Sequence, residues 1–311
     1  MTRPQGMVIR VLNYNILWDA IFPDDDPNNH IWRDVDKSKA FRRILRAVRP
    51  DIACLQEINP VRDPADVGAI FDEELPLADG RLWQVVKSGD NYIVARFNLQ
   101  QNGFALRVNF EVSARVDLPD ASFGDTDLYM VCAHFKSGGG QANIDERQRQ
   151  ADLVMSQVRE FRTAGGRIEL PFGTPYLLLG DFNVYDTDPH YHLTTLLSGD
   201  IVNEDQFGAD VLPDWDDSSL ADALPTHNGA GQLDYTWRSD GSGFAPYALD
   251  RILYSDSVML IVNKFILNTT LLSAQELSAF GLSADDVVIK LASGYYDHFP
   301  MVVDFVILAG E

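Results

Sequence analysis

The residues with the clearest capacity for chemistry are Asp181 and Asn183, which follow an apolar run at 176–179. Such a run predicts a strand covered on both faces, and a carboxylate at its end must be solvated, paired or metal-bound. Strand alternation places the two side chains on one side, and Gly180 allows close backbone approach. Their oxygens are hard ligands that suit Mg²⁺, Mn²⁺ or Ca²⁺. The alternative is an Asx-turn that closes the strand.

Several other apolar runs also end in an acid, an amide or an imidazole. These residues are Asn13 and Asn15 after 8–12, Glu57 after 52–55, His134 after 131–133, Asp250 within 248–252, and Asp297 and His298 just before 299–307. Each alone has an ordinary explanation, such as a solvated strand end, a hydrogen-bonded core histidine, a structural pair with Arg251 or a turn. Together they favour a site, because functional groups gather at the ends of buried strands in α/β proteins.

The elements that must position these residues are mainly strands. The patterns predict strands at 8–12, 52–55, 83–86, 92–95, 105–110, 128–133, 176–179, 249–253, 260–265 and 301–307, and helices at 38–48, 66–75, 145–162 and 190–197. This mixture favours mixed sheets flanked by helices over a doubly wound parallel sheet. Two irregular stretches, 18–37 and 185–237, are predicted to shape a binding surface and to choose the substrate.

The composition of the chain limits the kinds of molecule that it can bind. The 311 residues carry 25 Lys and Arg against 46 Asp and Glu, a formal charge of −21, so the average field repels nucleic acid, anionic membranes and phosphorylated ligands unless cations or a local basic patch intervene. Cys54 and Cys132 lie in apolar runs and are predicted to be buried free thiols, with a disulfide as the alternative. Neither a signal peptide nor a run of about 18 apolar residues is present. We expect a soluble monomer, cytoplasmic as written or secreted if a leader was removed.

The order of the motifs resembles the endonuclease/exonuclease/phosphatase superfamily. The matching segments are Asn-Tyr-Asn-Ile at 13–16, Leu-Gln-Glu-Ile at 55–58, Ala-His-Phe-Lys-Ser at 133–137, Leu-Gly-Asp-Phe-Asn at 179–183, Leu-Asp-Arg-Ile-Leu at 249–253 and Asp-His-Phe-Pro at 297–300. The resemblance implies one domain over 1–311, built as an α/β (α+β) four-layer α/β/β/α sandwich with two packed mixed sheets. It also implies a divalent-metal-dependent phosphoester hydrolase that uses Mg²⁺, with Mn²⁺ or Ca²⁺ as alternatives.

The resemblance further assigns roles to individual residues. Glu57 becomes the principal metal ligand, helped by Asn15 and Asp297, while Asp181 and Asn183 position the attacking water and contact the scissile phosphate. His134, and His298 oriented by Asp250, hydrogen-bond the non-bridging oxygens or transfer protons. These types suit phosphoester hydrolysis, which needs charge neutralisation and an aligned water.

The chain departs from the family pattern at one point. The deoxyribonuclease branch orients the histidine that matches His134 with a glutamate, yet no glutamate occurs between Glu74 and Glu111. Asp90 is the nearest acid that could replace it, and Tyr92 is a second possible contact. Arg96 is a further possible phosphate contact, with a solvated arginine at a strand end as the alternative.

The substrate is the least determined feature. Lys136 and Arg147 flank three glycines at 138–140 and offer local positive charge, although Arg147 also fits the solvated face of a helix. A nuclease or general phosphodiesterase that binds nucleic acid weakly and with cations is favoured. A phosphatase or a phospholipid head-group phosphodiesterase is the alternative, followed by a non-catalytic binding module. His190 and His192 suggest a two-metal phosphatase of another fold, but we interpret them as lid or surface residues.

Overall fold

Two six-stranded β-sheets form the centre of the computed structural model, which describes residues 1–18, 20–22, 35–101, 109–185 and 191–308. The first sheet has the order β12-β15-β1-β2-β4-β3, and the second has the order β5-β6-β7-β8-β11-β9. The strands of the first are β1 (Ile9–Asn15), β2 (Ile52–Gln56), β3 (Gln84–Ser88), β4 (Asn91–Ala95), β12 (Met259–Ile266) and β15 (Met301–Ile307). Those of the second are β5 (Asn98–Gln100), β6 (Glu111–Asp117), β7 (Leu128–His134), β8 (Tyr176–Asp181), β9 (Ala221–Asp222) and β11 (Asp250–Tyr254). Both sheets mix parallel and antiparallel pairs, as predicted.

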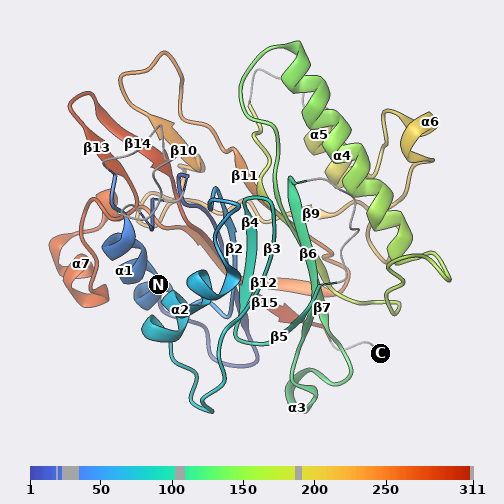
Figure 1. The fold of residues 1–311 in the computed structure, drawn as a ribbon, viewed down its shortest axis with the longest axis horizontal. Helices are drawn as coiled ribbons and strands as arrows, with labels where there is room; N and C mark the ends of the chain where they lie inside the picture. The colour runs from blue at the N-terminus through green and yellow to red at the C-terminus, as the bar shows by residue number, and fades with distance from the viewer. Residues whose placement is uncertain (19, 23–34, 102–108, 186–190, 309–311) are drawn as a thin grey trace.

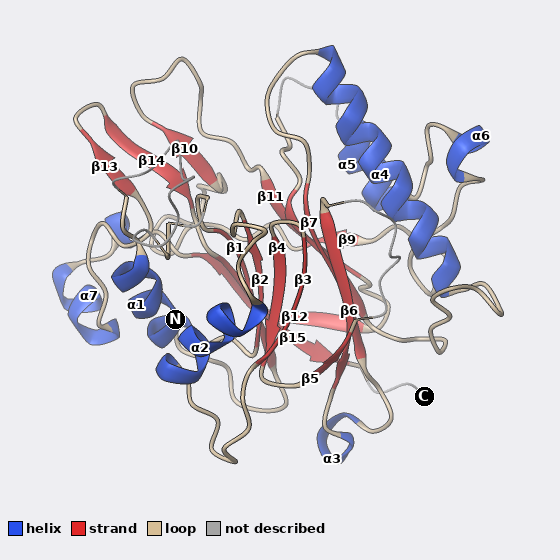
Figure 2. Ribbon diagram, viewed as in Figure 1, coloured by secondary structure: helices blue, strands red, loops and turns tan. Residues whose placement is uncertain are grey.

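Helices cover the outer faces of the two sheets (Figure 2). On the side of the first sheet lie α1 (Ser38–Val48) and α2 (Pro64–Glu74), and on the side of the second lie α4 (Gln141–Phe161) and α5 (Tyr191–Ser198). The remaining helices are short: α3 (Asp120–Phe123), α6 (Glu204–Phe207), η1 (Thr269–Leu271) and α7 (Ala274–Phe280). The α/β/β/α arrangement is therefore confirmed.

Strand β7 shows why the layers form in this way. Its even-numbered residues Leu128, Met130 and Cys132 belong to the core between the sheets, whereas Tyr129 and Val131 belong to the core under α4. Successive strand residues point to opposite faces, so a strand that is apolar at every position is buried on both sides. The continuous apolar run at 128–133 thus places β7 in the interior of the sandwich.

A third, small sheet lies at one edge of the sandwich, at the end away from α3 (Figure 1). It has the order β10-β14-β13 and consists of β10 (Trp237–Ser239), β14 (Gly294–His298) and β13 (Ile289–Leu291). The turn after β14 leads directly into β15, so the third sheet is tied to the central strands of the first sheet.

The two cysteines form a disulfide, which corrects the prediction of free thiols. Cys54 on β2 and Cys132 on β7 both point into the core between the sheets, and their Cα atoms are 5.7 Å apart. Two inward-facing cysteines can pair once the sheets pack, because this separation lies within disulfide range. The sequence gives no sign of the pairing, since 78 residues separate the partners.

Other differences from the predictions concern the predicted strand at 105–110 and the histidines. Residues 109–110 form a turn and the neighbouring strand is β6, while 102–108 and His190 lie outside the described residues. His192 is buried, with its ring centroid 6.4 Å from that of Phe135, so it is not a surface residue. Within the described residues, no helix is long and apolar enough to cross a membrane.

Candidate functional site

Three of the predicted site residues form one row across the second sheet. His134 ends β7 and is paired in register with Asp181 of β8, which is in turn paired with Asp250 of β11. Their strand neighbours two residues away, such as Cys132 and Leu179, point into the core between the sheets. The three side chains therefore share the face that looks toward the first sheet.

The first sheet supplies the opposite wall of the site. Asn15 ends β1 beside Gln56, and Glu57 follows directly after β2. The Asn15 amide Nδ2 donates to Glu57 Oε1 and to Asp181 Oδ2, both at 3.0 Å. A single buried amide thus connects the acids of the two sheets.

Unusual backbone conformations turn the chain sharply at these strand ends. Leu17, Trp18, Glu57 and Asn183 all have positive φ, a region that residues other than glycine seldom occupy. The turn at Glu57 lets its Oε2 accept the backbone N–H of Trp18 at 2.9 Å. Strain of this kind concentrates at functional sites, where the surrounding packing holds it in place.

Gly180 has the close backbone contact that its position at the end of β8 indicates. Its φ is +145°, and a Cβ placed on it would lie 1.8 Å from the carbonyl oxygen of Ala133. Any side chain here would push β8 away from β7. The glycine therefore fixes the distance between the strands that carry Asp181 and His134.

His298 and Asp250 form a buried pair. His298 Nδ1 lies 2.9 Å from Asp250 Oδ2, and its Nε2 points toward Asp181 Oδ2 at 3.6 Å. Burial lowers the pKa of His298, but the negative charges of Asp250 and Asp181 outweigh it and raise the pKa to about 9. Burial raises the pKa of Asp250, opposed by the charge on His298. The imidazole is therefore protonated at neutral pH and has its orientation fixed.

His134 has a matching arrangement in which Asp90 supplies the acid. Its Nδ1 lies 2.8 Å from Asp90 Oδ2, and its Nε2 lies 3.8 Å from Asp181 Oδ2. Burial lowers the pKa of His134, whereas the hydrogen bond to Asp90 and the charge of Asp181 raise it to about 9. The acid that the structure brings to His134 is therefore Asp90, the nearest candidate in the sequence. Tyr92 instead directs its hydroxyl to the carbonyl oxygens of Asn59 and Arg62.

Asp297, predicted as a metal ligand, is paired with a lysine. Lys37 forms a buried ion pair with Asp297 Oδ2 and donates to the Tyr14 hydroxyl at 2.9 Å, while Asp297 Oδ1 accepts the N–H of His298 at 2.7 Å. Burial lowers the pKa of Lys37 to about 7, although nearby carboxylates favour its charged form. Sequence reasoning missed Lys37, which lies at the end of the irregular stretch 18–37, and a lysine there carries no signal of its burial.

Two groups of side chains have the spacing of a metal site. One ligand-type atom from each of Glu57, His134 and Asp181 lies within 4.8 Å of the others, and the same holds for Asp181, Asp250 and His298. Asp181 is common to both. Beside them, Asn183 Nδ2 donates to the Phe135 carbonyl at 3.0 Å, so this amide also ties β8 to the loop after β7.

The predicted substrate contacts other than Asp90 lie outside this constellation. Lys136 is exposed on the loop after β7. Arg147 is fully buried and donates to the carbonyl oxygens of Lys136 and Gly138, so it supports that loop rather than lying on a solvated helix face. Arg96 follows β4 at the opposite end of the first sheet, where it pairs with Asp51 at 2.9 Å.

Comparison with known proteins agrees with this fold. The model of the Endonuclease/Exonuclease/phosphatase family matches residues 12–265. Among solved structures, a humanized D. rerio TDP2 has a TM-score of 0.53 at 16% identity, covering 97% of this chain and 100% of that one. The human Nocturnin catalytic domain has a TM-score of 0.53 at 18% identity, with coverages of 98% and 96%. ANGEL2, described as a 2′,3′-cyclic phosphatase, has a TM-score of 0.55 at 14% identity, with coverages of 96% and 95%. No curated protein matches the chain.

The sandwich, with histidines and carboxylates gathered at one edge of both sheets, is that of a phosphoester hydrolase. The chain belongs to the endonuclease/exonuclease/phosphatase family. Enzymes of this family use divalent metals, and the groups around Asp181 are suitable places for one.

Proposed function

We propose that the chain is a Mg²⁺-dependent phosphodiesterase that cleaves nucleic acid by in-line attack of water. The observation that carries the proposal is the convergence of Glu57 and Asn15 from one sheet with His134, Asp181 and the Asp250–His298 pair from the other. Such a site surrounds a phosphoryl group with both acids and cationic donors.

The donor set fits a hard divalent cation. Glu57 Oε1 and Asp181 Oδ2 both lie 3.0 Å from the same Asn15 nitrogen, so two carboxylate oxygens face a common space. Glu57 would hold the ion, and Asn15, whose Oδ1 accepts the Leu17 N–H at 3.0 Å, would orient the two carboxylates through its Nδ2. When bound, the ion would supply positive charge to the phosphoryl oxygens. Asp297, which forms an ion pair with Lys37, would support the site from behind the residues that hold the ion.

The chain's own residues provide the remaining steps. His134 and His298, both charged at neutral pH, direct Nε2 toward Asp181 and would donate to the non-bridging oxygens of a phosphate seated there. Asp181 would orient the attacking water and accept its proton, with Asn183 beside it. Asp250 and Asp90 fix the ring orientations and stabilise the imidazolium charges.

An aromatic wall beside the site favours a substrate with planar rings. Trp237 is paired across from His298, and Tyr296 lies two residues before it, so all three share one face of the third sheet. The Trp237 ring is 5.9 Å from that of Tyr296 and is stacked on Tyr247 at 6.4 Å. Aromatic faces stack on bases without regard to sequence. Nucleobases flanking the scissile phosphate are therefore suitable occupants.

Two of the structural neighbours are consistent with this class of substrate. A D. rerio TDP2 structure holds a single-stranded DNA product, and ANGEL2 is seen with adenosine-2′,3′-vanadate. In both, nucleotide material occupies an enzyme of the same fold. The likeness supports the proposal, and the substrate itself must be found by assay.

The decisive test is a metal panel with several phosphoesters. Plasmid DNA, RNA, bis-p-nitrophenyl phosphate, p-nitrophenyl phosphate and a phospholipid are incubated with Mg²⁺, Mn²⁺, Ca²⁺ or chelator. We expect cleavage of the nucleic acids and the synthetic diester with Mg²⁺, lost on chelation and in Glu57→Gln, but retained in the exposed control Glu204→Gln. Exclusive hydrolysis of the monoester or of the phospholipid would overturn the proposal. Absence of any hydrolysis would favour a binding module.

The contribution of the aromatic wall is tested with Trp237→Ala. Stacking of one base contributes about 1–3 kcal/mol, so binding of a single-stranded oligonucleotide should weaken roughly 5- to 150-fold. An abasic oligomer with the same backbone should bind the variant and the wild type equally. Equal losses for both oligomers would mean that the wall does not contact bases.

A further inference from the structure

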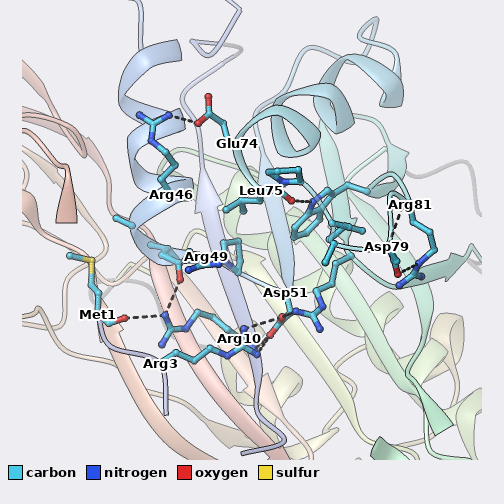
Figure 3. Close-up of a pocket in the computed structure, with 18 residues that line it drawn as sticks. Met1, Arg3, Arg10, Arg46, Arg49, Asp51, Glu74, Leu75, Asp79 and Arg81 are labelled. Atoms are coloured by element: carbon cyan, nitrogen blue, oxygen red, sulfur yellow. Dashed lines mark hydrogen bonds and ion pairs between the residues drawn. The ribbon is translucent and has the colours of Figure 1, made fainter. Parts of the chain in front are cut away.

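A large pocket lies at the end of the first sheet opposite to Glu57. It has a volume of about 1030 Å³ and is bounded by the C-terminal end of α1, the end of α2 with the segment after it, and the residues that flank β2 and β4 (Figure 3). Asp51 at its floor precedes β2, whereas Glu57 follows that strand. At about 3.3 Å per residue, β2 separates the two places by roughly 17 Å. The pocket is therefore separate from the catalytic site.

The charge of the pocket is opposite to that of the chain. The protein has 46 acidic and 25 basic residues, yet six arginines and three acids line this cavity. The arginines are Arg3, Arg10, Arg46, Arg49, Arg81 and Arg96, and the acids are Asp51, Glu74 and Asp79. Arg10 is neutralised by the buried Asp304, which lies outside the cavity lining, at 2.7 Å. Arg46 and Arg81 pair with Glu74 and Asp79, so the excess positive charge comes from Arg3, Arg49 and Arg96 against Asp51.

The carboxylates that line the pocket do not neutralise all of its arginines. Arg3 and Arg96 share the single carboxylate of Asp51, at 3.0 Å and 2.9 Å from its Oδ1. Arg96 keeps 46% of its side chain exposed. Arg49 is also exposed; its backbone N–H donates to the Leu45 carbonyl at 2.8 Å, but its guanidinium has no hydrogen-bond or ion-pair partner among the described residues. Exposed guanidinium groups retain donors that match phosphate oxygens two at a time.

The backbone at Arg49 supports a specific role for this residue. It caps α1 with φ 51° and ψ 61°, a left-handed conformation for which glycine or asparagine is the usual choice. The helix end nearby carries partial negative charge, but Arg10 donates to the Val48 carbonyl at 2.8 Å and reduces its effect. An arginine therefore occupies a position where glycine or asparagine would be less strained.

We propose that this arginine pocket is a second anion site, which takes a ligand with two or more clustered phosphate groups. Its volume accommodates a compact polyphosphate or a short length of nucleic-acid backbone, which present the same chemistry. Arg49 and Arg96 contact the phosphates, with Arg3, Arg46 and Arg81 around them. The site exists whether or not the catalytic centre cleaves nucleic acid.

The test is a titration of the full chain with two probes at low ionic strength in chelator. The probes are inorganic tripolyphosphate and a single-stranded oligonucleotide. Every protein in the titration carries His298→Asn, so that the catalytic site competes less for the probe. In that background, Arg49→Gln/Arg96→Gln should weaken binding of at least one probe roughly tenfold or more. The control Lys39→Gln/Lys290→Gln removes the same charge from exposed residues elsewhere and should change binding less than about twofold.

A second variant guards against loss of folding. Arg49→Asn relieves the left-handed strain at the cap, so its melting temperature should equal or exceed that of the parent while its binding weakens. Tripolyphosphate binding assigns the site to compact polyphosphates, and binding of the oligonucleotide alone assigns it to a nucleic-acid backbone. Binding of neither probe, or equal weakening in the arginine and lysine double variants, would overturn the proposal.

Discussion

Asp90 offers the sharpest test of the proposed catalytic arrangement, because its carboxylate is hydrogen-bonded to the ring of His134. Its Oδ2 is 2.8 Å from His134 Nδ1, and it helps to raise the pKa of that histidine to about 9. Asp90→Asn keeps the shape and removes the charge. A hydrogen bond to a charged group contributes about 1.5–3 kcal/mol, so kcat/KM should fall roughly 10- to 150-fold.

The assay is steady-state hydrolysis of bis-p-nitrophenyl phosphate with Mg²⁺, with kcat and KM determined separately. The loss should lie mainly in kcat, because the charged histidine matters most when charge develops on the phosphoryl oxygens. Asp90→Glu, which keeps the charge, should recover part of the activity, and the exposed control Asp205→Asn should match the wild type. Activity of Asp90→Asn within threefold of the wild type, at an unchanged melting temperature, would refute the reasoning.

Three further predictions concern buried groups. Asp250→Asn leaves His298 without its charged partner and should lower kcat by roughly a hundredfold or more with an unchanged circular dichroism spectrum; near-normal turnover would contradict the proposed pair. Burial raises the pKa of Glu111 from 4.5 to about 7. Because the folded state therefore favours the protonated carboxyl, its contribution to the free energy of unfolding is complete below pH 4.5 and is lost as the pH rises through 7, about 3 kcal/mol in all. Urea unfolding at a series of pH values should show this fall in the free energy of unfolding for the wild type and not for Glu111→Gln. The same pH dependence in both proteins would contradict the prediction. Replacing Cys54 and Cys132 by serine opens a link across 78 residues and should cost about 4 kcal/mol of unfolding free energy, so a loss below 1 kcal/mol would count against the chain-entropy account.

The sequence was sufficient to predict the row of site residues because local patterns define strand ends. The apolar run 52–55 stops before Glu57, and the run 128–133 stops before His134, so the pattern alone indicates that each residue lies at the end of a buried strand. When the strands of one sheet pair, their register brings these strand ends side by side. Helix 38–48 was predicted with its observed limits for a similar reason, since Pro50 prevents its extension.

Features that depend on packing between distant segments were not predictable in the same way. The Cys54–Cys132 disulfide needs the contact between two sheets, and the Lys37–Asp297 pair joins residues 260 positions apart. Lysine is seldom buried, so its type argued against a place in the interior. Of the strand predicted at 105–110, only 109–110 belong to the described residues, where they form a turn before β6.

The charge balance of the site explains why these missed contacts matter for the proposed chemistry. Five carboxylates surround the row, those of Glu57, Asp90, Asp181, Asp250 and Asp297, against three cationic groups, those of Lys37, His134 and His298. Even with Lys37 and both histidines fully charged, the site has an excess of two negative charges, in a protein whose overall charge is −21. A phosphodiester, itself an anion, would be repelled from such a centre. Under the proposed function, one divalent cation would offset that excess, so the carboxylates would make metal binding a condition for substrate binding as well as for turnover.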